Sequence, residues 1–298
     1  MNNEVIIKSF LHFIKVIKDI PNTERATLLY RGQPNVKYEL LPSIARLNEE
    51  NNKTLLEYEH KLVSKAIGKN PNLFSEDNHA INLLVKLQHF GIPTRLLDVT
   101  YNPLVALYFA CLDSDTEDGE ITVFKAKYQM NSQEEKTDEI IHFFNNRFVN
   151  IIASTYKIDG KYPKDIEFLL DTIGYKYNGF NIKKDNIYFS TDIEEVVNNI
   201  KKPLFVSPIE LTERQKRQQG AFILFPNKIS DGEDRYYYIN QIDSISKCDK
   251  CIIERLKIPK DLKKEMIKSI SKFGITEEFL FPDSMEVICK TIKNGIYT

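Results

Sequence analysis

The stretch LQHFGIPTRLLDVTYNPLVALYFA, residues 87–110, decides how this chain folds. Gly91 and Pro93 end an apolar helical segment, and Asn102 followed by Pro103 is typical of a helix start, with an N-cap and a proline at the first helical position. The helix that follows is apolar nearly all round, so we expect it to be buried. Between the two helices lies a high density of polar residues for a buried neighbourhood: His89, Arg95, Asp98, Thr100 and Asn102.

Two interpretations of these polar residues remain open. In the first, they form a ligand site. In the second, the segment is a structural turn, in which Arg95 and Asp98 form an ion pair and Asn102 caps the helix. His89 is the one histidine of the five that lies beside this cluster.

Two further segments place polar residues at the ends of expected strands. Residues 26–33, ATLLYRGQ, are a short apolar run that closes on Arg31 and Gly32. The glycine lets a ligand approach the backbone, and the guanidinium can clamp a phosphate with two hydrogen bonds. Residues 214–226, RQKRQQGAFILFP, place Gln219 directly before a glycine and a buried strand, so that its amide can face a pocket.

The remaining pattern predicts a single α+β domain, with mixed or antiparallel strands packed against helices. Residues 1–24 are expected to form a helical lead-in, and residues 25–298 the domain, with an insertion of weak periodicity at about 129–200. Strands are expected in LLYRGQ, GEITVFKAKY, LFVSPIEL, GAFILFP, RYYYINQI and CIIERLKIP. Helices are expected at 4–19, 54–68 and 78–90, from Asn102 onward, and from about Lys260 and Pro282.

Composition excludes some function classes and favours others. The 41 basic and 42 acidic residues leave a net charge of −1, without the strongly basic character of a protein that binds nucleic acid by charge alone. The longest apolar stretch falls well short of a membrane span, and no signal core or lipidation motif is found, so we expect no membrane role. Four scattered cysteines do not make a disulfide framework, so a reducing cytoplasm is expected.

Several motifs with a known chemistry are missing from the sequence. It has no glycine-rich dinucleotide fingerprint, no phosphate loop, no HExxH and no nucleophile elbow. Cys248 and Cys251 form one C-x-x-C pair, but a zinc site of the usual kind needs a second pair of ligands, so no metal is predicted.

The three polar segments together resemble the FRG domain family, which takes its name from an aromatic-Arg-Gly motif. Tyr30, Arg31 and Gly32 stand where that motif is expected, and GIPTRLLDVTYNPLVALYFA resembles the central block of the family. RQQGAFIL resembles its Gln-Gly-Phe block, and FGITEEFLFPDSMEVI, residues 273–288, its terminal signature. The resemblance covers roughly residues 25–290, with Val99 at a position where the family often has tryptophan.

A more distant resemblance is to ADP-ribosyltransferases of the Arg-Ser-Glu type. That family has an aromatic-Arg-Gly strand, then a Ser-Thr-Ser strand that leads into an Ala-x-x-Phe helix, then a Glu-x-Glu strand start. The positions similar in order here are Arg31, residues 98–100 before the apolar helix, and residues 218–220 before Phe222.

This second resemblance implies an ADP-ribosyltransferase-like cleft that binds NAD. Arg31 would hold the diphosphate or a ribose, the Gly32 backbone would pair with the nicotinamide amide, and Thr100 would support the first strand. Gln219 stands in place of the catalytic glutamate and supplies a hydrogen bond without a negative charge, while Glu210 is the nearby carboxylate that could replace it. The other residues expected to contact the cofactor are Tyr30, Gln33, His89, Arg95, Asp98 and Asn102.

Three functions follow from these observations. The first is a cytoplasmic bacterial toxin or phage-defence effector that binds NAD or a related nucleotide and modifies a protein or nucleic-acid target. The second is a non-catalytic module that senses a nucleotide, a nucleic-acid end or a phage protein, which the missing glutamate favours. The third is phosphate-ester hydrolysis that uses Asp98, Glu210 and a divalent metal.

Overall fold

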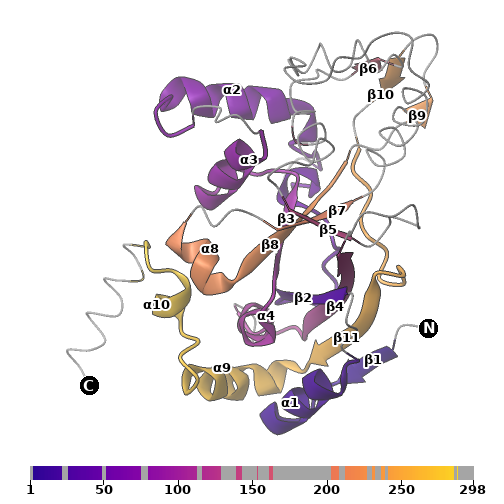
Figure 1. The fold of residues 1–298 in the computed structure, drawn as a ribbon, viewed down its shortest axis with the longest axis vertical. Coiled ribbons are helices and arrows are strands. Elements are labelled where there is room, and N and C mark those ends of the chain that lie inside the picture. The colour runs from indigo at the N-terminus through magenta and orange to yellow at the C-terminus, as the bar shows by residue number, and fades with distance from the viewer. Residues whose placement is uncertain are drawn as a thin grey trace.

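The computed structural model has a mixed eight-stranded sheet with helices against it, which confirms the predicted α+β class (Figure 1). The structure describes residues 3–21, 26–48, 52–74, 80–112, 116–128, 139–142, 153, 161–163, 203–207, 212–226, 230–231, 236–238, 241–284 and 287. Most of the predicted insertion at 129–200 and the last helix expected after Pro282 therefore lie outside the described residues.

The main sheet has the strand order β1-β11-β4-β2-β3-β8-β7-β5. Its strands are β1 (Asn3–Ile6), β2 (Ala26–Gln33), β3 (Leu96–Thr100), β4 (Gly119–Tyr128), β5 (Glu139–His142), β7 (Leu204–Ser207), β8 (Gly220–Leu224) and β11 (Ile252–Ile258). A small second sheet consists of β6 (Lys161–Pro163), β10 (Tyr236–Tyr238) and β9 (Ser230–Asp231). Because β5 also pairs with β4, the strands from β4 to β5 close into a ring.

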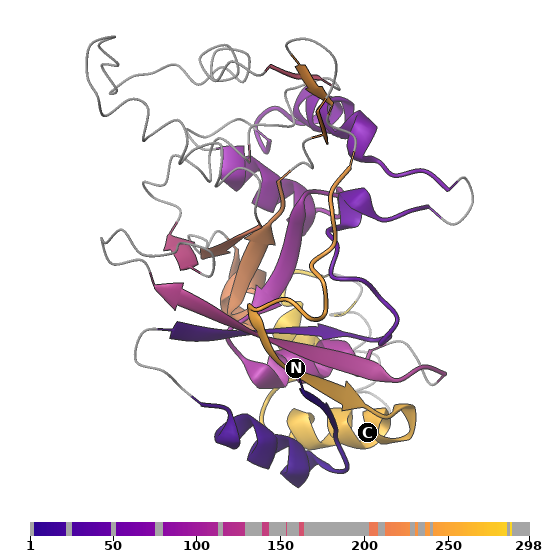
Figure 2. The same cartoon turned by 90° about the vertical axis from the view of Figure 1, so that its right-hand side faces the viewer.

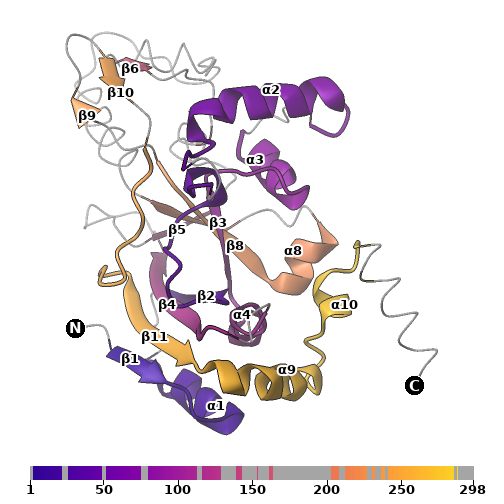
Figure 3. The ribbon, with the colours of Figure 1, turned by 180° about the vertical axis from the view of Figure 1, so that it is seen from behind.

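Helices cover the outer face of the sheet and one of its ends. They are α1 (Phe10–Asp19), α2 (Glu59–Lys69), α3 (Ala80–His89), α4 (Pro103–Ala110), α8 (Glu213–Gln218), α9 (Lys263–Ser271) and α10 (Glu277–Leu280). Three single turns of 3-10 helix are η1 (Ser43–Ala45), η2 (Leu56–Tyr58) and η5 (Lys260–Leu262). Helices α1 and α9 lie beside β1 and β11, and α2 and α3 lie at the opposite end of the molecule, as the views from both sides show (Figures 1 and 3).

Among the described residues, two apolar clusters form the core. The first joins residues of the ring strands, among them Leu29, Leu97 and Ile223. The second packs the outer face of β2, β4 and β11 against α1, α4 and α9. Alternation along β2 explains the division, since Leu29 points toward the first cluster and Tyr30 toward the second.

Strands β2 and β3 separate almost as soon as they meet. They share a single register pair, Tyr30 with Thr100, whereas β2 pairs with β4 along all eight of its residues. The strands on the two sides of this separation cross one another, as the side view shows (Figure 2). Residues 31–33 therefore leave β3 and open a gap in the middle of the sheet.

Gly32 is required by the packing of α4. A Cβ at this position would lie 1.8 Å from the Ala106 carbonyl oxygen, and one at Gly119 in β4 would lie 2.1 Å from the Ala110 carbonyl oxygen. From the sequence, the missing side chain of Gly32 was expected to make room for a ligand at the backbone. In the structure, the backbone of a helix fills the space of the missing side chain.

The prediction of a helical lead-in over residues 1–24 is wrong for residues 3–6. These residues form β1, which pairs in parallel with β11 at the edge of the main sheet. The helix begins only at Phe10, because the Ser9 hydroxyl caps it by accepting from the His12 amide at 3.1 Å. The N-terminal segment is thus part of the sheet.

Candidate functional site

A cavity of about 390 Å³ lies at the gap between β2 and β3. Its walls come from β2, β3, β8, α3, α4 and α8, and from the loop that follows β2. Seven of the predicted site residues line it, namely Tyr30, Arg31, Gly32, Gln33, His89, Asp98 and Thr100. Arg95, Asn102 and Gln219 do not line it, and Glu210 lies outside the described residues.

Arg31 occupies the gap itself. Its Nη1 donates to the Asp98 main-chain oxygen at 2.7 Å, so the guanidinium takes the place of the strand pairing that is missing there. Its Nε is buried and has no hydrogen-bond partner. Burial lowers the pKa of Arg31 to about 10, and the charge of Asp98 opposes that shift. Arg31 is therefore charged at neutral pH and keeps a donor unused.

Arg46 brings a second guanidinium to the cavity, and no sequence motif pointed to it. It follows the η1 turn, and its Nε donates to the Leu41 carbonyl at 3.1 Å. Burial lowers the pKa of Arg46, while the charge of Asp98 and the Tyr38 side chain act in the opposite direction. The charges of Arg46 and Arg31 disfavour one another, as expected for a pair that binds an anion.

Asp98 is hydrogen-bonded to a different residue from the one predicted. Its Oδ1 accepts from Gln88 Nε2 at 2.8 Å, and the Gln88 Oε1 accepts from the buried Thr94 hydroxyl. The interpretation in which Arg95 and Asp98 pair is therefore wrong. Alternation along β3 explains this, because Asp98 lies on the cavity side and Arg95 precedes the strand at its other end.

Arg95 is a core residue. It is 1% exposed, and its Nε donates to Glu59 Oε1 at 2.9 Å while its Nη2 pairs with Glu59 Oε2. Its Nη1 also donates to the Phe225 carbonyl at 3.4 Å. A buried arginine with these partners has no free edge for a ligand, so the structure does not support the predicted contact of Arg95 with a cofactor.

Thr100 and Asn102 stabilise the turn from β3 into α4. The Thr100 hydroxyl donates to the Gln218 main-chain oxygen at 2.6 Å and accepts from the Asn102 amide at 3.0 Å. The Asn102 side chain accepts from the Leu104 amide at 2.9 Å, which confirms its predicted capping role. Asn102 caps a helix instead of lining the cavity, whereas Thr100 ties the β2–β3 junction to α8.

Gln218, and not Gln219, is the amide at the cavity. The segment before β8 forms α8, and Gln219 ends it in the left-handed conformation with φ +46°. This turn leaves the Gln219 side chain exposed, and its carbonyl accepts from the Tyr101 amide. Gln218 lines the cavity, and its Nε2 donates to the Leu280 carbonyl at 3.1 Å.

The C-terminal segment closes one side of the cavity. His89 Nε2 lies 3.0 Å from Asp283 Oδ2, and the Arg214 guanidinium stacks 4.6 Å from the centre of the Phe281 ring. Phe281 also meets Phe109 of α4 edge to face. His89, Arg214 and Phe109 line the cavity, so the terminal Phe-Pro-Asp signature supports its wall.

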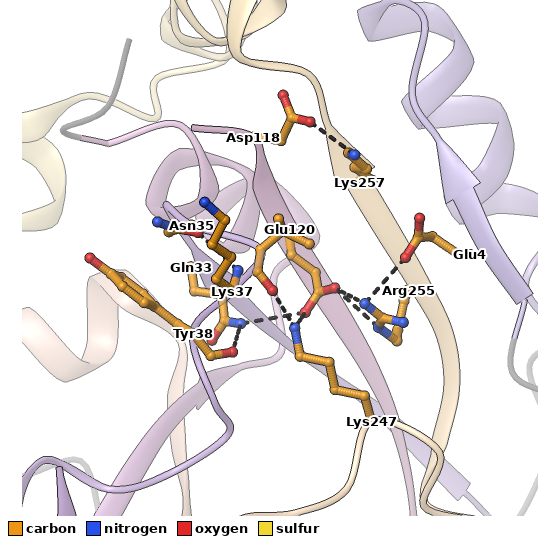
Figure 4. Close-up of polar contacts among 11 residues, drawn as sticks. Glu4, Gln33, Asn35, Lys37, Tyr38, Asp118, Glu120, Lys247, Arg255 and Lys257 are labelled. Carbon is orange, nitrogen blue, oxygen red and sulfur yellow. Dashed lines mark hydrogen bonds and ion pairs between the residues drawn. The ribbon is translucent and has the colours of Figure 1, made fainter. Parts of the chain in front are cut away.

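A second cluster of charges lies beside the cavity and is fully paired (Figure 4). Glu120 is completely buried; its Oε1 lies 2.8 Å from Lys247 Nζ, and its Oε2 accepts from Arg255 Nε at 3.0 Å. The Gln33 Nε2 donates to the Tyr38 carbonyl at 2.9 Å and to Glu120 Oε1 at 3.4 Å. This cluster fixes the loop after β2, which lines the cavity.

The described cysteines and carboxylates do not assemble a metal site. Within the ranges given above, no group of three or more His, Cys, Asp or Glu residues is placed to hold a metal ion. Cys248 is exposed and Cys251 is buried in the turn before β11, where its amide donates to Asp249 Oδ1 at 3.0 Å. The predicted pairing of Asp98 with Glu210 around a metal falls partly outside the described residues.

None of the helices among these residues is long and apolar enough to cross a membrane.

The fold and the cavity define an α+β protein with a pocket of mixed polar and apolar lining where its sheet divides. The family model of the FRG domain matches residues 26–119, which hold the aromatic-Arg-Gly strand, β3 and α4. The match supports the resemblance of this region to the FRG domain. No curated protein and no solved structure matches the chain.

Proposed function

We propose that the cavity binds a nucleotide with a diphosphate group, and that NAD is its ligand. The observation that carries this proposal is the buried, unpartnered Nε of Arg31, beside the second guanidinium of Arg46. Three arginines and two carboxylates line the pocket, so positive charge is left for an anion to neutralise. Phosphate oxygens suit this arrangement, because the planar guanidinium binds them with two hydrogen bonds.

The rest of the lining suits the other parts of a nucleotide. Tyr30, Phe109 and Phe222 supply aromatic surface for planar rings, and Thr100 and Gln218 supply polar groups. A volume of about 390 Å³ is within the range of small-molecule sites. The likeness of Arg31, Thr100 and the Gln218 region to the three motifs of ADP-ribosyltransferases supports NAD as the particular nucleotide.

Two outcomes of binding are open to the same pocket. In the first, the protein transfers ADP-ribose to a macromolecular target and acts as a toxin or phage-defence effector, a role that rests on the family resemblances. In the second, it senses the nucleotide without turnover. The lack of a glutamate favours the second, since Gln219 stands at the position of the transferase glutamate and its side chain is exposed away from the cavity. Losing a preorganised charge at a developing cation costs about 10²-fold or more in rate.

The first experiment is nucleotide binding, followed by thermal shift and isothermal titration. NAD and ADP-ribose are each titrated into the wild type, Arg31→Ala and Lys37→Ala. Lys37 belongs to the same loop region but pairs with Glu117 at 3.0 Å outside the cavity, so its variant removes a charge without touching the pocket. We expect the Arg31 variant to bind about 10- to 100-fold more weakly, the loss of a charged hydrogen-bonding group.

The result also decides between the two outcomes. Release of nicotinamide in the wild-type samples supports the transferase, and binding without release supports the sensor. The proposal is contradicted if neither ligand binds the wild type, or if Arg31→Ala and Lys37→Ala bind equally well. Circular dichroism of both variants checks that they fold.

A further inference from the structure

The carboxylate of Asp98 is held in one orientation by a short chain of side chains. Gln88 Nε2 donates to Asp98 Oδ1 at 2.8 Å, and the Thr94 hydroxyl donates to Gln88 Oε1. Thr94 is 1% exposed, and its Oγ also accepts from the Leu96 amide at 3.2 Å. Gln88 of α3 is thus the residue that contacts this oxygen of Asp98, and Thr94 of the following turn orients Gln88.

This chain has a direction. A hydroxyl has one hydrogen to donate, and that of Thr94 is given to the oxygen of the Gln88 amide. The amide nitrogen must then face Asp98, where it meets a carboxylate that can only accept. Oδ2 of Asp98 accepts no hydrogen bond from the described residues, and the side chain is exposed to the cavity.

We propose that Asp98 makes this pocket selective for ligands that carry a positive charge near their phosphates, and that Gln88 and Thr94 position its carboxylate. The inference rests on the proposed function, because the phosphates are assigned to Arg31 and Arg46. A ligand of this class is an oxidised nicotinamide dinucleotide, whose pyridinium ring is cationic, as opposed to its reduced form, whose ring is neutral.

Two features of the cavity favour a planar cation over a hydroxyl group at this position. Arg31 donates to the main-chain oxygen of Asp98 and not to its carboxylate, although the charge of that carboxylate acts on both Arg31 and Arg46. Aromatic rings of Tyr30, Phe109 and Phe222 line the same cavity, and aromatic faces attract cations. The Asp98 carboxylate and these aromatic residues would both attract a cationic ring of the ligand.

Glu39 provides a matched control. It is the other described carboxylate that lines the cavity, and it is exposed on the loop after β2. Neither Gln88 nor Thr94 contacts it in the hydrogen bonds of the described residues. Glu39→Gln removes the same charge as Asp98→Asn but leaves the positioning chain intact.

The test is isothermal titration of NAD⁺, NADH and ADP-ribose into the wild type, Asp98→Asn and Glu39→Gln. We expect the wild type to bind NAD⁺ about tenfold more tightly than NADH, the effect of one pair of opposite charges near a protein surface. Asp98→Asn loses this preference and binds ADP-ribose at least as tightly as the wild type, because the charge that it removes acts on the two guanidinium groups assigned to the phosphates. Glu39→Gln keeps it. The inference is overturned if Asp98→Asn weakens the binding of NAD⁺, NADH and ADP-ribose by the same factor. It is also overturned if Glu39→Gln no longer binds NAD⁺ more tightly than NADH.

The positioning residues have their own test. Thr94→Val removes the hydroxyl at similar volume, and Thr94→Ser restores it. We expect the ratio of the NADH to the NAD⁺ dissociation constants to fall in the valine variant and to recover in the serine variant, with ADP-ribose affinity unchanged in both. A merely structural role would weaken all three ligands together and leave the ratio as in the wild type.

Failure of this inference and failure of the proposed function give different results. If ADP-ribose binds and depends on Arg31, but NAD⁺ and NADH bind equally, only the selectivity of Asp98 is refuted. If none of the three ligands binds the wild type, the proposed function is refuted and the selectivity with it.

Discussion

Arg31 lies in β2 and Arg95 directly precedes the neighbouring strand β3, and the two arginines differ in how they are paired. Arg95 lies in the core, and both oxygens of Glu59 neutralise it. Arg31 lies where β2 leaves β3, donates to one main-chain oxygen and keeps a buried Nε without a partner. Both were expected from the sequence to bind a ligand, and only one of them lines the cavity.

The difference teaches how to separate a structural charge from a binding charge. A buried ion is tolerated when its partners satisfy it, as Glu59 satisfies Arg95 and as Arg255 and Lys247 satisfy Glu120. An arginine left short of partners in a lined cavity costs stability unless a ligand completes it. The region around Arg95 is therefore expected to control unfolding, and the region around Arg31 to control binding.

The largest effect is expected from Arg95→Met. The variant leaves the Glu59 carboxylate buried without its partner, which costs about 3–5 kcal/mol in the free energy of unfolding. Urea unfolding followed by circular dichroism measures this cost. If the free energy of unfolding is unchanged and nucleotide binding is lost, Arg95 is a ligand-binding residue like Arg31, and the distinction between the two arginines is wrong.

Gly32→Ala tests whether the glycine beside Arg31 serves the fold. The new Cβ would meet the Ala106 carbonyl oxygen at 1.8 Å, and we expect a loss of about 1–3 kcal/mol from overpacking. Gly68→Ala in α2 is the control. It has open space around it and should stabilise the protein by about 0.5–1 kcal/mol, because glycine disfavours helix. A stable Gly32→Ala protein would contradict the close packing of α4.

Asn102→Ala tests whether Asn102 caps α4 or binds the ligand, and its expected effect on stability is smaller than that of Gly32→Ala. Losing the hydrogen bond to the Leu104 amide should lower the free energy of unfolding by about 1 kcal/mol. Asn102→Asp keeps an acceptor and should restore most of it. Nucleotide affinity is expected to stay at the wild-type value in both variants. A loss of binding free energy larger than the loss of unfolding free energy would show that Asn102 contacts the ligand.

The smallest effect concerns the reactivity of two cysteines. Burial raises the pKa of the Cys111 thiol, at the end of α4, to about 12, so almost no thiolate forms there between pH 7 and 9. Cys248 is exposed. We expect iodoacetamide to label Cys248 over this pH range and Cys111 only after unfolding, as peptide mass spectrometry can measure. Rapid labelling of folded Cys111 would show that the helix behind the cavity opens.

Local signals in the sequence predicted much of the fold. The caps and breakers around residues 91–103 placed the end of α3 and the start of α4, because an N-cap and a following proline act within one turn. The strand segments became β2, β4, β7, β8 and β11. Residues 3–6 were misassigned, because the strand forms only through its pairing with β11, far along the chain.

The candidate site was predictable where one segment carries its chemistry. The Tyr30–Gln33 strand end and Asp98 were found, since a polar group within or at the end of an apolar run is visible locally. Partners that depend on tertiary structure were missed. Glu59 reaches Arg95 across 36 positions, Arg46 enters from a separate turn, and the left-handed end of α8 turns Gln219 out and leaves Gln218 at the cavity.

The most direct test of the account is the crystal structure of the protein with ADP-ribose bound. We predict that the diphosphate lies in the gap between β2 and β3, that one of its oxygens accepts from Arg31 Nε, and that Arg95 stays paired with Glu59. Density for the nucleotide elsewhere on the protein, or in the cavity with Arg31 Nε still without a partner, would contradict the central claim.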